Sequence, residues 1–163
     1  MDENQILNQC NLENWDEMYF YFSFSIFSAY FGGFFHELNY EDYWITNGIS
    51  SVFAENFMTE KCGTLNTWFK KYKYLKWYWD QMLLGKDVLP LASKLWPNPA
   101  EIKWNEVYFV KSRLVMSNIV HMVGTENFIK FIWRLLEYIS NSNECISISI
   151  FKLFKKVLGI KLH

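Results

Sequence analysis

The sequence contains one short run that resembles the beginning of a zinc-binding motif. His36-Glu37 matches the first two residues of H-E-x-x-H, in which two histidines one helical turn apart bind zinc and the glutamate acts as general base. The fifth position is Tyr40, and a zinc ion needs three or four protein ligands. The other histidines are His121, in an apolar stretch, and His163, at the C-terminus. We therefore expect no metal site here, and we expect His121 to be a core or edge residue of its helix.

The cysteines suggest neither a disulfide framework nor a cysteine zinc site. There are three of them, Cys10, Cys62 and Cys145, and they are far apart, with no C-x-x-C pair. An odd number of widely spaced cysteines is typical of reduced thiols in an intracellular protein. The formal net charge of −1 over 163 residues also gives no global field that would attract nucleic acid or an anionic membrane.

Two further runs keep the spacing of a zinc-peptidase site. They read Tyr30-Phe31-Gly32-Gly33 and Asp42-Tyr43-Trp44-Ile45-Thr46-Asn47-Gly48. This frame resembles the zinc-helix region of the aminopeptidase N family of gluzincins, in which H-E-L-A-H-Q-W-F-G-N is followed, eight residues later, by D-L-W-L-N-E-G. Phe31-Gly32 matches F-G of the first motif, and Asp42, Trp44 and Gly48 match D, W and G of the second, without a gap.

In this register every position that carries the chemistry is substituted. The resemblance places the two zinc histidines at Phe24 and Ser28, the general-base glutamate at Ser25, and the ligand glutamate of the following helix at Asn47. A phenyl ring has no lone pair for zinc, and neutral serine and asparagine are poor ligands without an imidazole or a carboxylate. The resemblance therefore implies a catalytically dead member of the family, with no cofactor and no metal.

A downstream anchor extends the resemblance. Lys111, Gly124 and Phe128 have the mutual spacing of the family's Y-S-K-G-A-S and G-E-x-x-F motifs. The tyrosine that stabilises the tetrahedral intermediate then falls at Phe109, which lacks the hydroxyl donor. Tyr108 is adjacent, but on a helix it is turned about 100° away.

The same runs are closer still to one inactive branch of this family, the aminopeptidase-like subunit of the general transcription factor TFIID. The shared features are Gly-Ile-Ser at 48–50 and Lys-x-x-Leu-Val-Met at 111–116. The branch implies a nuclear scaffold element that contacts other TFIID subunits, and weakly promoter DNA, and has no small-molecule substrate. The alternatives are an aminopeptidase-family protein outside transcription, active or degenerate, and a small membrane-associated helical protein.

Helical periodicity supplies the elements that would position these residues. We expect helices at 18–30, 41–61, 65–84, 107–123 and 126–140, with the first buried on most sides. Gly63, Gly85 and Gly124 are natural helix stops, and Thr64 and Thr125 are candidate N-caps. The expected buried faces comprise Trp44, Ile45, Ile49, Val52, Phe53 and Phe57 in the second helix and Phe128, Ile132, Leu135 and Ile139 in the last.

The fold class that follows is mainly α, corresponding to the helical part of a gluzincin catalytic domain without its N-terminal β-domain. We divide the chain into a polar N-terminal segment (1–17), a degenerate peptidase-like domain (18–140) and a basic amphipathic tail (141–163). Residues 86–104, which contain all three prolines, read as a loop, and Ile146–Ile150 alternates like an isolated strand. Met18–Phe35 reaches the length of a membrane span, but its serines and glycines favour a core helix.

One predicted helix carries a long apolar stripe, which is unfavourable when exposed to water. It comprises Leu65, Trp68, Phe69, Tyr72, Leu75, Trp79, Met82 and Leu83. In the resembled family a helical unit packs against the domains before and after it, so we expect this face to be uncovered in the chain alone. The tail, with Lys152, Lys155 and Lys156 on one side, either covers its own domain or binds a partner or membrane surface.

Overall fold

The described part of the chain is a set of α-helices. The computed structural model describes residues 3–34, 43–85, 91 and 105–142, and side chains within 18–34, 43–85, 91 and 105–137. Within these residues there is no strand, and the helices are α1 (Glu3–Phe34), α2 (Tyr43–Cys62), α3 (Thr64–Leu83), α5 (Glu106–Val123) and α6 (Thr125–Ser142). The mainly α fold class expected from the sequence is confirmed.

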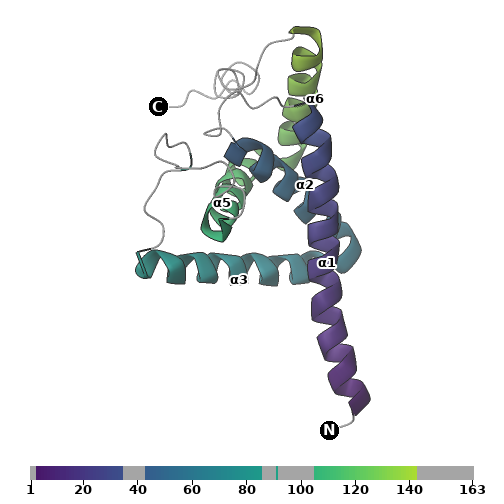
Figure 1. Ribbon diagram of the computed structural model, residues 1–163. Helices are drawn as coiled ribbons and strands as arrows, with labels where there is room; N and C mark the ends of the chain where they lie inside the picture. Colours follow the sequence, from purple (N-terminus) through teal and green to yellow (C-terminus); the bar gives the residue numbers. More distant parts are fainter. Residues whose placement is uncertain (1–2, 35–42, 86–90, 92–104, 143–163) are drawn as a thin grey trace.

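Helix α2 lies at the centre of the arrangement. It packs against α1, α3 and α5, while α6 packs against α5 and α1. Figure 1 shows α3 running at a steep angle to α1, with its C-terminal end on the side of the view away from α1. Helix α1 is the longest element, and its N-terminal half extends below the level of α3 (Figure 1).

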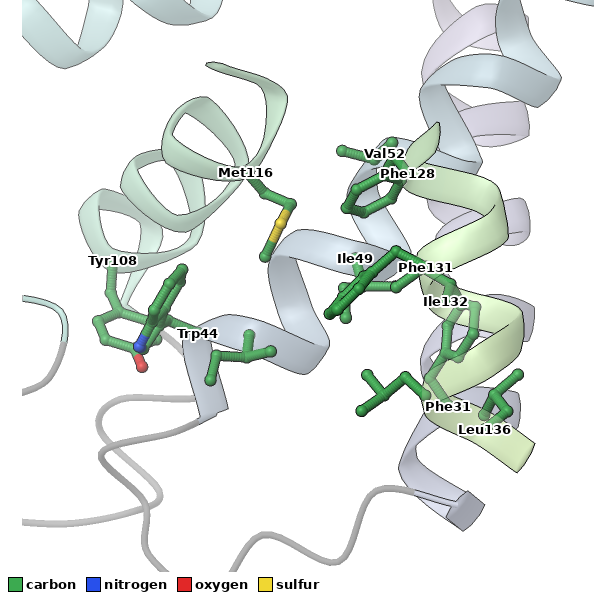
Figure 2. Packing of buried hydrophobic residues seen from close by; sticks show 12 residues of the cluster. Phe31, Trp44, Ile49, Val52, Tyr108, Met116, Phe128, Phe131, Ile132 and Leu136 are labelled. Carbon is green, nitrogen blue, oxygen red and sulfur yellow. The ribbon is translucent and has the colours of Figure 1, made fainter. Parts of the chain in front are cut away.

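The main core forms where α2 meets α1, α5 and α6. Its buried side chains are Phe31, Trp44, Ile45, Ile49, Val52, Tyr108, Met116, Phe128, Phe131, Ile132, Leu135 and Leu136. Figure 2 shows Phe128, Phe131 and Ile132 of α6 facing Ile49 and Val52 of α2. A smaller cluster of Phe20, Ala54 and Met58 joins α1 to the second half of α2. These clusters fix α2 against three neighbouring helices.

Single glycines connect two pairs of helices. Gly63 has a φ of 84°, which side-chain-bearing residues rarely adopt, and it separates α2 from α3. Its N–H donates to the Thr59 carbonyl at 3.1 Å and its own carbonyl accepts from the Thr67 N–H at 3.3 Å, so one residue ends one helix and begins the next. Gly124, with a φ of 85°, does the same between α5 and α6.

Several local expectations need correction. The residue that caps α3 is Gly63, and Thr64 is the first residue of the helix itself. Helix α1 begins at Glu3, well before Met18, and it is not buried on most sides. Between residues 18 and 34 only Phe20, Ser23 and Phe31 are buried. The reason is that apolar residues surround this helix, whereas neighbours among the described residues cover one face only.

In α2 and α6 the buried faces match the expected ones closely. Trp44, Ile45, Ile49 and Val52 are buried, whereas Phe53 and Phe57 are half-buried. In α6, Phe128, Ile132 and Leu135 are buried as expected, together with Phe131 and Leu136. The side chain of Ile139, most of the expected loop at 86–104, the alternation at 146–150 and nearly all of the 141–163 tail lie outside the described residues.

Candidate functional site

Two of the positions that the resemblance assigns to a catalytic site are in direct contact. The rings of Phe24, on α1, and Phe109, on α5, have centroids 5.0 Å apart and an interplanar angle of 77°. This edge-to-face geometry is the favourable one for aromatic pairs. The positions that the resemblance assigns to a zinc histidine and the catalytic tyrosine thus lie together, and they make an apolar contact.

Two consecutive hydrogen bonds connect a third assigned position, Asn47, to Phe109. Asn47 on α2 donates from Nδ2 to Oγ of Ser112 at 2.5 Å, and that hydroxyl donates to the carbonyl of Phe109 at 2.8 Å. Asn47 and Ser112 are almost fully buried. Because the hydroxyl of Ser112 accepts one hydrogen bond and donates another, it ties α2 to α5 beside the Phe24–Phe109 contact.

Ser25 and Ser28, the other two assigned positions, do not take part in these hydrogen bonds. Ser25 is exposed, and its hydroxyl donates to the Tyr21 carbonyl at 2.7 Å within α1. Ser28 is half-buried, and no hydrogen bond among the described residues joins it to Asn47 or Ser112. The structure therefore gathers Phe24, Asn47 and Phe109, and leaves Ser25 at the surface.

Next to Asn47, the α2 backbone approaches α5 closely at Gly48. A methyl group placed on Gly48 would lie 2.8 Å from Cβ of Met116 and 3.1 Å from the carbonyl oxygen of Ser112. Real Cβ atoms do not come so close to other carbon atoms, so only glycine fits here without a shift of α5. This is the glycine that aligns with the second family motif, and its role is helix packing.

The side chains gathered in this region are suited to packing. Two phenyl rings, an amide and a hydroxyl offer no group that accepts a proton readily at neutral pH and no strong zinc ligand. Across the described residues, no three His, Cys, Asp or Glu side chains come together as a metal-binding group would require. The region can therefore join helices, and its described side chains supply no general base.

A buried ion pair among the described residues was not anticipated from the sequence. Arg113 on α5 donates from Nε to Oε1 of Glu55 on α2 at 2.5 Å. Their side chains are only 4% and 10% exposed. A charged pair this deeply buried is stabilising only while both partners are present, because removing one leaves an uncompensated charge out of water.

Two aromatic rings enclose the same guanidinium. Its central carbon lies 4.2 Å from the ring centroid of Phe20, on α1, and 4.2 Å from that of Tyr74, on α3. Cation–π contacts are strongest when the cation is desolvated, as it is here. We call Arg113, Glu55, Phe20 and Tyr74 the arginine clamp; one side chain thereby links α1, α2, α3 and α5.

A faint sequence signal for the clamp exists in retrospect. Glu55 follows Gly48 and Val52 at spacings of seven and three, so it belongs to the buried face of α2. Arg113 precedes Met116 by three residues and so shares a buried side of α5. A carboxylate and a guanidinium on the inner faces of two helices each need a polar partner when buried. The sequence does not show that they pair with each other, because they lie 58 residues apart.

The described surface has two hollows of notable size. One, of about 350 Å³, lies among α2, α3, α5 and the start of α6, and its lining includes Thr59, Lys71, Ser117 and His121. Lys71 is already hydrogen-bonded to Ser117 across this cleft. The other, of about 270 Å³, is lined only by apolar and aromatic side chains of α1, α2 and α6, among them Trp133. His121 is exposed and not a core residue.

The outer face of α3 is an uncovered apolar surface. All eight residues of the expected apolar stripe are exposed, at 43–84% of their maximum, and we call them the α3 face: Leu65, Trp68, Phe69, Tyr72, Leu75, Trp79, Met82 and Leu83. No described residue of α3 is buried. The sequence expectation that this face is uncovered in the chain alone is therefore met.

Comparison with known proteins adds no relative. No family model, no curated protein and no solved structure matches this chain. None of the helices in the described part, α1 included, has an apolar stretch that could cross a membrane.

Proposed function

We propose that this chain is a non-catalytic helical interaction element that docks onto a protein partner through the α3 face. The observation that carries this proposal is the exposure of that face. Four of its members are aromatic and each is about 60% exposed. Such side chains carry about 150–250 Å² each, so the four alone expose about 500 Å² of apolar surface. The leucines and methionine extend the face beyond the 300–600 Å² patch typical of a monomer.

The chemistry of the degenerate positions supports the non-catalytic part of the proposal. Phe24 and Phe109 pack against each other, and Asn47 is held by Ser112. None of these side chains can hold a zinc ion or activate water. The alternative, a working aminopeptidase, would need zinc ligands and a general base that these aligned positions do not provide.

The motif resemblance supports a finer proposal, namely that the partner belongs to a TFIID-type assembly in the nucleus. The supporting runs are Gly-Ile-Ser at 48–50 and Lys-x-x-Leu-Val-Met at 111–116. In such an assembly the chain would act as a scaffold, supporting promoter recognition and polymerase II initiation through protein contacts. Any contact with promoter DNA would be weak, because the net charge is −1.

The first test is the behaviour of the isolated 163-residue chain in size-exclusion chromatography with light scattering. We expect concentration-dependent, heterogeneous association or poor solubility, because the α3 face has no cover. The triple variant Trp68→Gln, Tyr72→Gln, Trp79→Gln should be monodisperse. The matched control is Trp133→Gln, which changes an aromatic residue of similar exposure on α6 and should not restore solubility. A natural chain that runs as a stable monomer with a cooperative melt would contradict the proposal.

The second test addresses the assembly. The tagged full chain, expressed in its native cells, should co-purify with TATA-binding protein in a stable complex, and the α3 triple variant should lose it. Co-expression with TFIID subunits should likewise keep the natural chain soluble. Stable co-purification with a complex that lacks TATA-binding protein would refute the TFIID proposal while leaving the interaction role intact.

A further inference from the structure

Helix α3 is attached to the rest of the molecule by its polar side. At about 100° per residue, the members of the α3 face fall on one side of the helix and Thr67 and Tyr74 on the opposite side. Thr67 hydrogen-bonds with Thr59 of α2 at 3.2 Å, and Tyr74 belongs to the arginine clamp. The apolar side of this amphipathic helix therefore faces away from the described core, the reverse of the usual arrangement.

The charge of α3 is opposite in sign to that of the whole chain. It contains four lysines and one aspartate, a net charge of +3, whereas the complete chain carries −1. The lysines divide into two pairs. Lys70 and Lys71 are partly buried, and Lys71 contacts Ser117, whereas Lys73 and Lys76 are exposed beside the α3 face. The outer side of α3 thus combines an apolar stripe with two accessible positive charges near its middle.

This pattern disfavours a second copy of the chain as the occupant. A two-fold dimer through α3 would place its axis near the midpoint of the stripe from Leu65 to Leu83. Lys73 and Lys76 lie within about 3 Å of that midpoint along the helix, so four ammonium groups would gather around the axis. The segment 143–163 is disfavoured on similar grounds, because its four lysines and one glutamate give it the same sign of charge as α3.

The pattern also disfavours a nucleic acid. Binding to phosphates depends on the number of lysines and arginines that reach them. Only Lys73 and Lys76 of α3 are exposed, and Lys73 already lies 5.0 Å from the ring centroid of Phe69. The α3 face has eight exposed apolar residues and only two exposed lysines beside it. This composition is more typical of a protein-binding surface than of a phosphate-binding surface.

We propose that the α3 face binds an acidic amphipathic helix of a partner protein. This inference rests on the proposed function and names the chemistry of the partner. The stripe spans 18 residue steps, about 27 Å, so a partner helix of about five turns would match it. Its apolar stripe would cover the α3 aromatics, and glutamates or aspartates at its edges would face Lys73 and Lys76. Acidic flanks would also favour this partner over basic helices during encounter.

The test uses the full chain and three synthetic fluorescein-labelled peptides, at protein concentrations below the onset of self-association. Each peptide is an amphipathic 21-residue helix with the same leucine and phenylalanine stripe. The flanking positions hold glutamate in the first, glutamine in the second and lysine in the third. Fluorescence anisotropy should show that the glutamate peptide binds at least about tenfold more tightly than the lysine peptide. The preference should shrink as salt is raised, because the lysines are exposed.

Variants make the assignment specific. Trp79→Ala should weaken binding of the glutamate peptide by about tenfold or more, and Lys73→Glu with Lys76→Glu should reverse the peptide preference. The matched controls are Trp133→Ala and Lys130→Glu, exposed residues of α6 that should leave binding unchanged. All these side chains are exposed, so folding should survive each change, as circular dichroism can verify.

The outcomes separate the two proposals. If no peptide binds in a manner that depends on Trp79, the proposed function and the inference fail together. If binding depends on Trp79 but the lysine or glutamine peptide binds as tightly as the glutamate one, only the acidic partner is refuted. Tighter, Trp79-dependent binding of a labelled single-stranded 20-mer oligonucleotide, or a discrete dimer abolished by Trp79→Ala, would also overturn it.

Discussion

Replacing Arg113 by methionine tests whether the arginine clamp holds the helices together. Methionine keeps an apolar stem of similar length but loses the charge, the hydrogen bond to Glu55 and the cation–π contacts with Phe20 and Tyr74. The Glu55 carboxylate would then be left with no ion-pair partner in the clamp, although its side chain is only 10% exposed. The variant therefore creates an uncompensated buried charge.

The expected cost follows from that charge. Removing one partner of a buried ion pair costs about 3–5 kcal/mol. Each cation–π contact of a desolvated guanidinium adds up to about 2 kcal/mol. Sulfur–aromatic contacts of the new methionine return about 0.3–1.5 kcal/mol per ring. We therefore expect Arg113→Met to lower the free energy of unfolding by about 3–5 kcal/mol, out of the 5–15 kcal/mol typical of a domain.

The assay is urea unfolding followed by far-ultraviolet circular dichroism, in the soluble triple-glutamine background of α3. With a urea dependence of about 1–3 kcal/mol per molar, the midpoint should fall by about 2 M. The double variant Glu55→Met, Arg113→Met should recover most of the loss, because an apolar pair replaces a buried ion pair at little cost. Raising the salt concentration should change little, since the pair is buried.

An exposed arginine provides the control for Arg113→Met. Arg134 is an exposed arginine of α6, so Arg134→Met should change stability by no more than about 0.5 kcal/mol. If Arg113→Met costs no more than this control, the clamp does not hold the helices together. If the double variant loses as much as the two single variants combined, Glu55 and Arg113 act independently and the pairing argument is wrong.

Three further predictions test the packing of α1, α2 and α5 and the pseudo-peptidase interpretation. Gly48→Ala should lower the free energy of unfolding by about 1–3 kcal/mol, because the new methyl group would clash with Met116. Gly32→Ala, with nothing within 4 Å of the new methyl group, should raise it by about 0.5–1 kcal/mol. Urea unfolding distinguishes the two signs. A double-mutant cycle of Phe24→Ala and Phe109→Ala should give a coupling energy of about 0.5–1.5 kcal/mol; additive losses would show that the rings do not interact. Atomic absorption should find less than stoichiometric zinc, with no hydrolysis of aminoacyl substrates; one tightly bound zinc per chain would refute the pseudo-peptidase interpretation.

Helix existence was predictable because glycines mark the ends of the strongest apolar periods. Helices α2, α3, α5 and α6 each begin and end within two residues of the expected bounds. Gly63 and Gly124 supply the positive φ that a one-residue joint needs. The start of α1 was missed because residues 3–17 show no apolar period, although they contain no glycine or proline to interrupt a helix.

The motif spacing predicts which residues of the candidate site lie near one another, but not how their side chains interact. The resemblance predicted that Phe24, Asn47 and Phe109 would lie in one region, and the contacts join Phe109 to each of the other two, directly or through Ser112. The roles that the resemblance assigns to these positions stay a prediction. The motif spacing does not predict which side chains these residues contact. The hydrogen bond from Asn47 to Ser112 and the pairing of Glu55 with Arg113 each join α2 to α5 across more than 50 residues of sequence. Such pairings depend on how two helices cross, which periodicity alone does not encode.

The contrast between α3 and α6 shows what decides the direction of an amphipathic helix. Both carry an aromatic apolar stripe, yet the α6 stripe is buried in the core and the α3 stripe is exposed. Periodicity predicts a stripe in each case but not its neighbour. In α3 the opposite side makes specific polar contacts, through Tyr74 to Arg113, Thr67 to Thr59 and Lys71 to Ser117. Because these contacts need fixed partners, whereas apolar burial is non-directional, they orient α3 and leave its apolar face exposed.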